Sequence, residues 1–283
     1  MTTYEHITVT PLSSAIGATI GNVSISSELD DGIIAEIRQA LLDHLVIFFR
    51  DQDLTDIEHH KAFTKRFGDL FVHPNFDLGQ NNPEMVYLTR LPGDKSAAGE
   101  EWHADTTMMA SPPMGAILYA IEAPEVGGDT LFANQYLAYE TLSDGMKRMI
   151  MGLRAVHNDT RVAGPAAAKN KKRTSKVRED KNWQATENIH PVVRTHPETG
   201  RKCLFLNGVY VHNFEGMTVK ESEPLLYYLY DHAVRPEFTC RFRWQSGSVA
   251  FWDNRCVQHL ALHDNHNMTR RMQRTQIQGD VVR

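Results

Sequence analysis

The sequence predicts a predominantly β fold of the sandwich or jelly-roll type, with an all-β core and helical inserts. From Met85 onward, short runs rich in β-branched and aromatic residues recur, and glycine or proline turns separate most of them. Two longer stretches with helical spacing interrupt this series. The expected strands are Met85–Thr89, Ala116–Ile121, Thr130–Ala133, His190–Thr195, Cys203–Leu206, Phe238–Trp244, Ser248–Trp252 and Arg270–Gln278.

The first part of the chain is predicted to fold as helix, strand and helix. Residues Asp31–His44 carry apolar side chains at helical spacing, which predicts an amphipathic helix that leads into a buried strand over Leu45–Phe49. Thr55 and Glu58 form the T-x-x-E pattern of a capping box, so a second helix is expected to begin there and to stop at Gly68.

The two helical inserts are expected at Asn134–Leu153 and Ser222–Ala233, where they would cover the sheets. Between them, Lys169–Arg178 contains six basic residues and little that is apolar, so we expect an exposed loop within a mobile stretch at 163–186. A single basic run without interleaved aromatic residues is weak support for nucleic-acid binding. Residues 1–283 are predicted to form one domain.

Composition and charge exclude several classes of function. The 283 residues are 41% hydrophobic and 23% charged, as in a globular chain, and the formal charge of −5 argues against a surface built for nucleic acid. Cys203, Cys240 and Cys256 are odd in number and lack C-x-x-C spacing, which argues against a disulfide framework and favours a reducing cytoplasm. The apolar run at Leu45–Phe49 is too short to span a bilayer, so neither secretion nor membrane insertion is expected.

The segment Glu101–Asp105 carries the pair of residues that points most clearly to chemistry. On an extended chain the side chains of His103 and Asp105, two positions apart, face the same side. An imidazole and a carboxylate placed in this way can chelate one metal ion. A distant second histidine would complete the two-histidine, one-carboxylate set of the non-haem iron(II) oxygenases.

Sequence context favours His103 over two other histidines in similar patterns. His157 with Asp159 repeats H-x-D, but it opens the polar, basic stretch, where a buried metal site would lack walls. His196 with Glu198 forms H-x-E between a proline and a glycine, which indicates an exposed hairpin tip. His103 is followed instead by threonines and methionines that could shield a reactive centre.

The third ligand is expected from a late strand, where His259 is the best candidate. His263 and His266 lie in a polar stretch of turn formers, whereas His259 is flanked by Val257 and Leu260. An imidazole in such apolar surroundings needs a partner, and a metal ion would supply one. From the residues alone, a core histidine with a hydrogen-bond partner is as good an interpretation as a metal ligand.

The final predicted strand places two arginines on one face. Arg270 and Arg274 are four residues apart, so a rise of about 3.3 Å per residue separates their Cα atoms by about 13 Å and lets both reach one cavity at different depths. A guanidinium binds a carboxylate or sulfonate through two hydrogen bonds and stays charged when desolvated. The pair suits two organic anions, although two arginines paired with surface acids would give the same pattern.

Five short motifs follow one another along the chain. They are W-H-A-D at Trp102–Asp105, G-G-D-T-L-F at Gly127–Phe132, W-D-N-R at Trp252–Arg255, Q-H at Gln258–His259 and R-R-M-Q-R at Arg270–Arg274. Together they resemble the taurine dioxygenase (TauD/TfdA) family, which includes the alkylsulfatase and the phenoxyalkanoate (dichlorprop) herbicide dioxygenases. The resemblance covers nearly the whole chain, and the order of the motifs is highly specific.

The resemblance implies a double-stranded β-helix that binds iron(II) through His103, Asp105 and His259. It also implies that Thr130 and Arg270 hold the distal carboxylate of 2-oxoglutarate, whose keto-acid end chelates the metal. By the same resemblance, the enzyme would consume O₂, release succinate and CO₂, and hydroxylate a small organic anion. Where the hydroxylated carbon bears a sulfonate, sulfate or ether oxygen, the product would collapse to a carbonyl compound and release that group.

The residues expected around the substrate depart from those of the taurine enzymes. By resemblance, Arg274 would clamp the acidic group of the substrate, and His73 takes the place of the histidine that contacts the sulfonate. Phe76 replaces an expected tyrosine and Gly99 an expected asparagine, which argues against the amine-side contacts of taurine. Tyr210 matches a tyrosine that touches the substrate in the phenoxypropionate enzymes. An apolar carboxylate, sulfonate or sulfate ester is therefore favoured over taurine.

Two other functions stay open from the sequence. A zinc-dependent hydrolase could use the same three ligands, although it would not need an anchor for a keto acid. A non-catalytic protein that binds a small acid on the same scaffold would keep Arg274 but would not need the metal ligands. We expect a small anionic substrate, no nucleic-acid or membrane partner, and a homo-oligomer. The helical face around Leu225, Leu226 and Leu229 could mediate self-association, with burial in the core as the favoured alternative.

Overall fold

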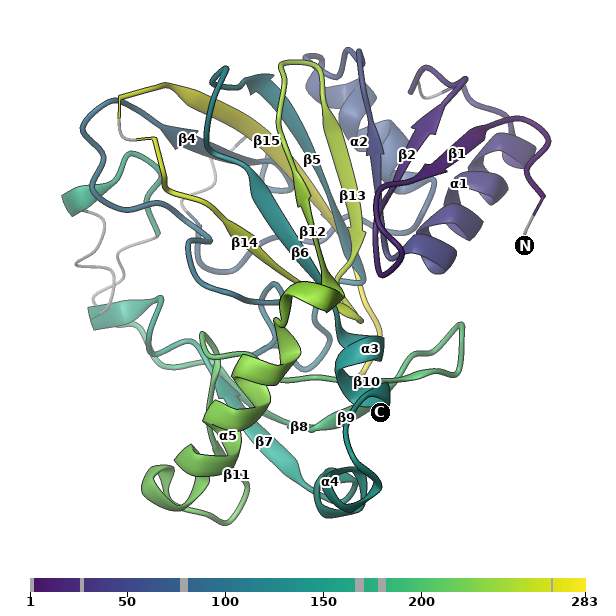
Figure 1. The fold of residues 1–283 in the computed structure, drawn as a ribbon. Coiled ribbons are helices and arrows are strands. Elements are labelled where there is room, and N and C mark those ends of the chain that lie inside the picture. Colours follow the sequence, from purple (N-terminus) through teal and green to yellow (C-terminus); the bar gives the residue numbers. More distant parts are fainter. Residues whose placement is uncertain (1–2, 26–27, 77–80, 166–170, 178–181, 266) are drawn as a thin grey trace.

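The structure of this chain is a computed structural model that describes residues 3–25, 28–76, 81–165, 171–177, 182–265 and 267–283. Its centre is formed by two facing β-sheets, with helices α1 and α2 at one side and α3, α4 and α5 grouped at the opposite end (Figure 1). No helix in these ranges has the length and apolar character that crossing a bilayer requires.

The larger sheet has seven strands in the order β1-β2-β3-β13-β5-β15-β4, and only the pair of β2 and β3 is parallel. Late strands lie among early ones, since β13 separates β3 from β5, and β15 separates β5 from β4. This nesting brings C-terminal residues beside the first half of the chain. The strands are β1 Thr8–Pro11, β2 Ala18–Gly21, β3 Val46–Phe49, β4 Val86–Arg90, β5 Gly115–Glu122, β13 Val249–Asp253 and β15 Arg270–Ile277.

A second sheet of three strands, in the order β12-β6-β14, faces the larger one. Its strands are β6 Thr130–Asn134, β12 Thr239–Phe242 and β14 Val257–Ala261. Aromatic rings fill the space between the sheets: Phe48 stacks on Phe242 with centroids 4.0 Å apart and meets the edge of Phe132 at 5.6 Å. The predicted jelly roll is thereby confirmed, with one apolar core enclosed by two sheets.

The helices α1, Asp31–His44, and α2, Ile57–Lys65, cover the outer face of the larger sheet (Figure 1). α1 has the predicted bounds, and Asp30 caps it by accepting a hydrogen bond from the Ile33 amide. The buried faces of both helices form a second apolar cluster with Phe251 of β13. The larger sheet is therefore buried on both faces along its central strands.

The start of α2 differs from the prediction. Its cap is Asp56, whose carboxylate accepts the Glu58 amide at 2.8 Å, while the Thr55 hydroxyl donates to Asp53 at 2.6 Å. An aspartate beside a threonine competes for the same cap, and its negative charge is favoured at a helix N-terminus. The predicted capping box is thus wrong, and the helix also ends before Gly68.

An extension at the other end of the molecule has its own apolar core. In the described part of the chain, β7 pairs with β8 and β11, and β9 pairs with β10. Its elements are α3 Gln135–Glu140, α4 Asp144–Ile150, β7 Arg154–Asn158, β8 Glu187–Pro191, β9 Val193–Thr195, β10 Lys202–Leu204, β11 Val211–Phe214, α5 Val219–Ala233 and the short 3₁₀ helix η2 Pro236–Phe238.

Several boundaries in this extension differ from the prediction. The helix expected over 134–153 is divided into α3 and α4, because the Ser143 hydroxyl caps a new helix there. The strand expected over 190–195 is divided between β8 and β9. α5 begins earlier than predicted, since Thr218 and Glu221 form a capping box.

The predicted mobile stretch at 163–186 lies partly outside the described residues. Its described parts are 163–165, 171–177 and 182–186. The segment 171–177 is attached to the body of the protein, since the Ser175 hydroxyl accepts a hydrogen bond from the Thr89 amide at 2.6 Å and donates one to the Thr89 carbonyl at 2.9 Å. The mobility of the stretch stays a prediction. Residues 171–177, however, are not the merely solvated loop that their composition indicated.

The packing between the two sheets gives a direct test of the fold. Phe48→Ala should lower the free energy of unfolding by about 3–5 kcal/mol, because it removes a fully buried ring that packs against both Phe132 and Phe242. Tyr227→Ala, on the exposed face of α5, should change it by less than about 0.5 kcal/mol. Urea unfolding followed by circular dichroism measures both. Similar losses for the two variants would contradict the assignment of Phe48 to the core.

Candidate metal and cosubstrate site

The three predicted metal ligands converge where the two sheets meet. His103 forms an antiparallel bridge with His259 of β14, in which the His103 amide donates to the His259 carbonyl at 3.0 Å and the His259 amide donates back at 2.8 Å. Asp105 lies two residues further on, with its Oδ1 3.8 Å from His103 Nε2. One nitrogen or oxygen from each of the three side chains lies within 4.8 Å of the others, and all three are buried.

The orientation of these side chains fits a metal ion. His103 Nδ1 donates to the Glu101 carbonyl at 2.7 Å, which leaves the lone pair of Nε2 directed away from that bond. His259 is held between the rings of Trp252 and Phe132, at centroid distances of 4.7 Å and 6.1 Å. Within the described structure, Asp105 Oδ2 and His259 Nδ1 are buried without a hydrogen-bond partner. Two imidazoles and one carboxylate are the donor set that iron(II) takes in oxygenases.

Electrostatics keep the ligands in their metal-binding forms. Burial by itself would raise the pKa of Asp105, but the Arg274 guanidinium, 3.0 Å away, and the imidazoles of His259 and His103 outweigh it and hold that pKa well below its usual range. Burial, together with the neighbouring His103, holds the pKa of His259 well below its usual value. The carboxylate is therefore charged and the imidazole neutral at neutral pH, as metal coordination requires.

Thr130 and Arg270 form a polar end of the same cavity. The Thr130 hydroxyl accepts a hydrogen bond from Trp244 Nε1 at 2.9 Å, so its own proton remains available for an acceptor in the cavity. Arg270 is buried, and its Nε and Nη2 have no hydrogen-bond partner among the described residues. Burial and the nearby Arg90 lower the pKa of Arg270 to about 9. A buried guanidinium of this kind calls for an anionic ligand.

The three predicted substrate contacts lie on the same cavity. His73 accepts the Asn75 amide through Nδ1 at 3.1 Å, so its Nε2 carries the proton, and burial with the nearby Arg274 lowers its pKa to about 3. His73 is therefore a neutral hydrogen-bond donor. Arg274 lies over the Phe76 ring, 6.0 Å from its centroid, and burial raises the pKa of Tyr210. These side chains and the metal ligands surround one cavity of about 130 Å³.

The rest of the cavity wall is largely apolar. It is lined by Leu88, Leu118, Val162, Val177 and Val209, among others. Sequence reasoning missed Val177, together with Arg173, because both belong to the basic stretch that was expected to be solvated. The single apolar residue in that stretch was the only local signal that part of it is buried.

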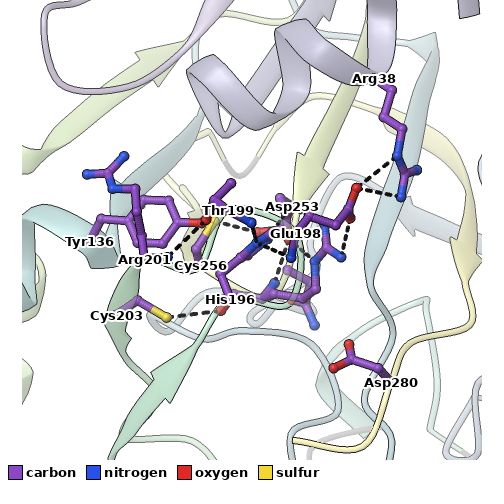
Figure 2. A network of polar contacts seen from close by, with 12 residues as sticks. Arg38, Tyr136, His196, Glu198, Thr199, Arg201, Cys203, Asp253, Cys256 and Asp280 are labelled. Carbon is purple, nitrogen blue, oxygen red and sulfur yellow. Dashed lines mark hydrogen bonds and ion pairs between the residues drawn. The ribbon is translucent and has the colours of Figure 1, made fainter. Parts of the chain in front are cut away.

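His196 and His157 lie outside this site, but neither has the surroundings that the sequence indicated. His196 is buried at the base of its hairpin, where its Nε2 donates to Asp253 at 3.0 Å, and Figure 2 shows it directed at that carboxylate. His157 is also buried, on β7, with its Nδ1 2.9 Å from the Thr107 hydroxyl. The predictions that His196 lies at an exposed hairpin tip and that His157 lacks buried surroundings were therefore wrong.

A second cluster of potential metal ligands, His196, Asp253 and Cys256, is better explained as an ion-pair network. Both oxygens of Asp253 accept hydrogen bonds from Arg255, at 2.8 Å and 2.6 Å. His196 Nδ1 accepts hydrogen bonds from two backbone amides of its own hairpin. The Arg255 guanidinium already neutralises the Asp253 carboxylate, and both ring nitrogens of His196 are already hydrogen-bonded. The cluster therefore has no free set of donor atoms for a cation.

Comparisons with known proteins agree with the geometry of the first site. The family described as "Taurine catabolism dioxygenase TauD, TfdA family" matches residues 8–276. An alkylsulfatase of Acinetobacter baylyi is 35% identical, over 98% of this chain and 87% of its own length. An alpha-ketoglutarate-dependent sulfate ester dioxygenase of Pseudomonas putida is 34% identical, over 98% of this chain and 91% of its own.

Solved structures show the same relationship. The crystal structure of a taurine dioxygenase from Burkholderia xenovorans superimposes with a TM-score of 0.82, at 38% identity, over 98% of this chain and 93% of that one. Since the family match and these relatives span nearly the whole chain, this protein belongs to the TauD/TfdA family and is an iron(II)- and 2-oxoglutarate-dependent dioxygenase.

Proposed function

We propose that this dioxygenase oxidises a small organic anion with an apolar body, namely a sulfonate, a sulfate ester or an aryloxy or alkyl carboxylate. The observation that carries the proposal is that two guanidiniums of one strand, Arg270 and Arg274, enter the cavity in which the three metal-ligand side chains converge. One suits the cosubstrate and the other the substrate. The match to an alkylsulfatase and a sulfate ester dioxygenase supports this class of anion.

His103, Asp105 and His259 would hold the metal ion. Bound iron(II) supplies the chemistry that activates O₂ at the expense of 2-oxoglutarate. The protein's own part would be to present two imidazoles and one carboxylate to the ion from one buried cluster, so that the cosubstrate and O₂ could bind beside it. The buried wall formed by Trp252 and Phe132 excludes water from this side of the site.

Thr130 and Arg270 would bind the distal carboxylate of 2-oxoglutarate. Arg270 is fixed from below by the Trp244 ring, whose centroid lies 5.6 Å from the guanidinium carbon, while the Trp244 indole N–H orients the Thr130 hydroxyl. One aromatic side chain thus prepares both groups for the same anion. The N–H groups of Arg270 that lack a partner in the described structure are buried. The guanidinium is therefore already desolvated before a carboxylate binds, which lowers the cost of binding.

Arg274, His73 and Tyr210 would bind the acidic group of the substrate. Arg274 supplies the charge and His73 a neutral N–H donor, which is a combination suited to the several oxygens of a sulfonate or sulfate. Gly99 has a φ of +80°, and a Cβ atom there would approach His103 Cε1 to 3.2 Å. Glycine at this position presents no side chain that could bind a substrate amine, which favours an apolar anion over taurine.

We further propose that the protein is cytoplasmic and forms a homo-oligomer. Cys203, Cys240 and Cys256 are free and buried, which agrees with a reducing compartment. Of the helical face suggested for self-association, Leu226 and Leu229 are buried in the core of the extension, as the favoured alternative predicted. A dimer interface would therefore have to use another surface.

A spectroscopic experiment tests the metal and cosubstrate assignment. Anaerobic addition of iron(II) and 2-oxoglutarate should produce a weak visible charge-transfer band, because the keto acid would bind the ion held by these residues. A screen of alkyl sulfates, sulfonates and aryloxy acids for succinate release should then identify the substrate class. A flat spectrum together with tight retention of zinc would favour the hydrolase, and a protein that binds the acids without releasing succinate would be a binding protein.

Kinetics of two arginine variants test the division of roles on β15. Arg270→Ala should raise the KM for 2-oxoglutarate by roughly 10- to 100-fold with little effect on that for substrate, since a charge-assisted hydrogen-bond pair contributes about 1.5–3 kcal/mol. Arg274→Ala should raise the KM for substrate instead. Arg271→Ala is the matched control, because that side chain is exposed and pairs with Glu122 at the surface. Equal effects of the first two variants on both KM values would show that the roles are not divided.

A further inference from the structure

The W-D-N-R motif contains an asparagine that contacts the candidate metal ligand Asp105 directly. Asn254 lies in the turn between β13 and β14 and is 1% exposed. Its Oδ1 accepts a hydrogen bond from the Asp105 amide at 2.7 Å, and its Nδ2 donates to the carbonyls of Asp105 and Pro113, each at 3.0 Å. A single side-chain amide thus binds both polar groups of the Asp105 backbone.

Asp105 needs this support more than His103 does. The backbone of His103 is fixed by its isolated antiparallel bridge to His259, through a hydrogen bond in each direction. Asp105 lies outside the strands, and Thr106, directly after it, adopts a left-handed φ of 45° that is unfavourable for a β-branched residue. The Asn254 amide takes the place of a neighbouring strand at the point where the chain leaves its extended path.

The turn that carries Asn254 is itself held rigidly. The backbone N–H of Asn254 donates a hydrogen bond to the Met114 carbonyl at 2.9 Å. Asp253, on one side, and Arg255, on the other, form the buried ion pair described above, and Arg255 Nη1 also binds Glu198 at 2.6 Å. Figure 2 shows His196 directed at Asp253 and the Glu198 carboxylate directed at Arg38. Among the described residues, none of these network side chains lines the cavity, and Asn254 is the residue of this turn that is hydrogen-bonded to Asp105.

We propose that Asn254 is a positioning residue that sets the direction of the Asp105 carboxylate toward the metal ion. The inference rests on the proposed role of Asp105 as a ligand. A carboxylate has two rotatable bonds between its backbone and its oxygens, so fixing the peptide groups on both sides of Asp105 restricts where those oxygens lie. Removing the Asn254 side-chain amide should lower the affinity for a metal ion even where the fold is retained.

The test measures binding of Mn(II), followed by the electron paramagnetic resonance signal of the free ion, without turnover. Asn254→Ala should lower Mn(II) affinity by about 10- to 100-fold, the usual effect of removing a group that orients a metal ligand. Asn134→Ala is the matched control: Asn134 is also buried and makes three side-chain hydrogen bonds, to Tyr136, Leu137 and Ala15, but none to a ligand. Its Mn(II) affinity should equal that of the unmodified protein.

The outcomes separate this inference from the function on which it rests. If the unmodified protein binds Mn(II) and Asp105→Ala does not, the site is supported, and an unchanged affinity in Asn254→Ala would overturn the role of Asn254 alone. Equal losses in Asn254→Ala and Asn134→Ala would also overturn it, because a general loss of stability would explain both. Should Asn254→Ala fail to fold, the comparison of Asn254→Ser with Asn134→Ser decides, with a loss of affinity expected only in the former.

Discussion

The antiparallel bridge between His103 and His259 is the constraint on which the rest of the site depends. Its two backbone hydrogen bonds join the smaller sheet to the segment that precedes β5, and they place the two imidazoles with ring centroids 4.2 Å apart. Because side chains alternate along a strand, a shift of this pairing by one residue would turn His259 away from the cavity. The register of this bridge therefore determines the candidate metal site as much as the identity of the three side chains does.

The parts of the fold and site that could be predicted are those specified by local pattern. A period of two placed Arg270 and Arg274 on one face of β15, and both are buried toward the cavity. The same period put His103 and Asp105 on one side of the chain. Helix α1 was predicted to its bounds because its apolar spacing agrees with its cap. The convergence of His259 on the other two ligands required the family resemblance, since no local rule links residues so distant in sequence.

The errors arose where distant partners decide burial. The hairpin at His196 was recognised, but the local rule that turns are exposed failed, because Asp253 and Arg255 bury the imidazole from another element. The strand β7 was missed because Arg154–Asn158 has no clear alternation, and it is stabilised by pairing with β8 and β11. From the sequence, Asn254 stood out only as part of the W-D-N-R motif, with no role of its own. Its contacts with Asp105 exist only in the folded chain, so no spacing along the sequence could reveal them.

Charge balance explains why the cavity combines these groups. Of the buried charged side chains that line the cavity, Asp105 is paired with Arg274, whereas Arg270 has no ion pair among the described residues. These three side chains together therefore carry one uncompensated positive charge. With the proposed ligands in place, a divalent ion is opposed by Asp105 and the keto-acid carboxylate, Arg270 by the distal carboxylate, and Arg274 by the substrate anion. A charged His73 would break that balance. The burial of His73 beside Arg274 keeps its imidazole neutral and so preserves this charge balance.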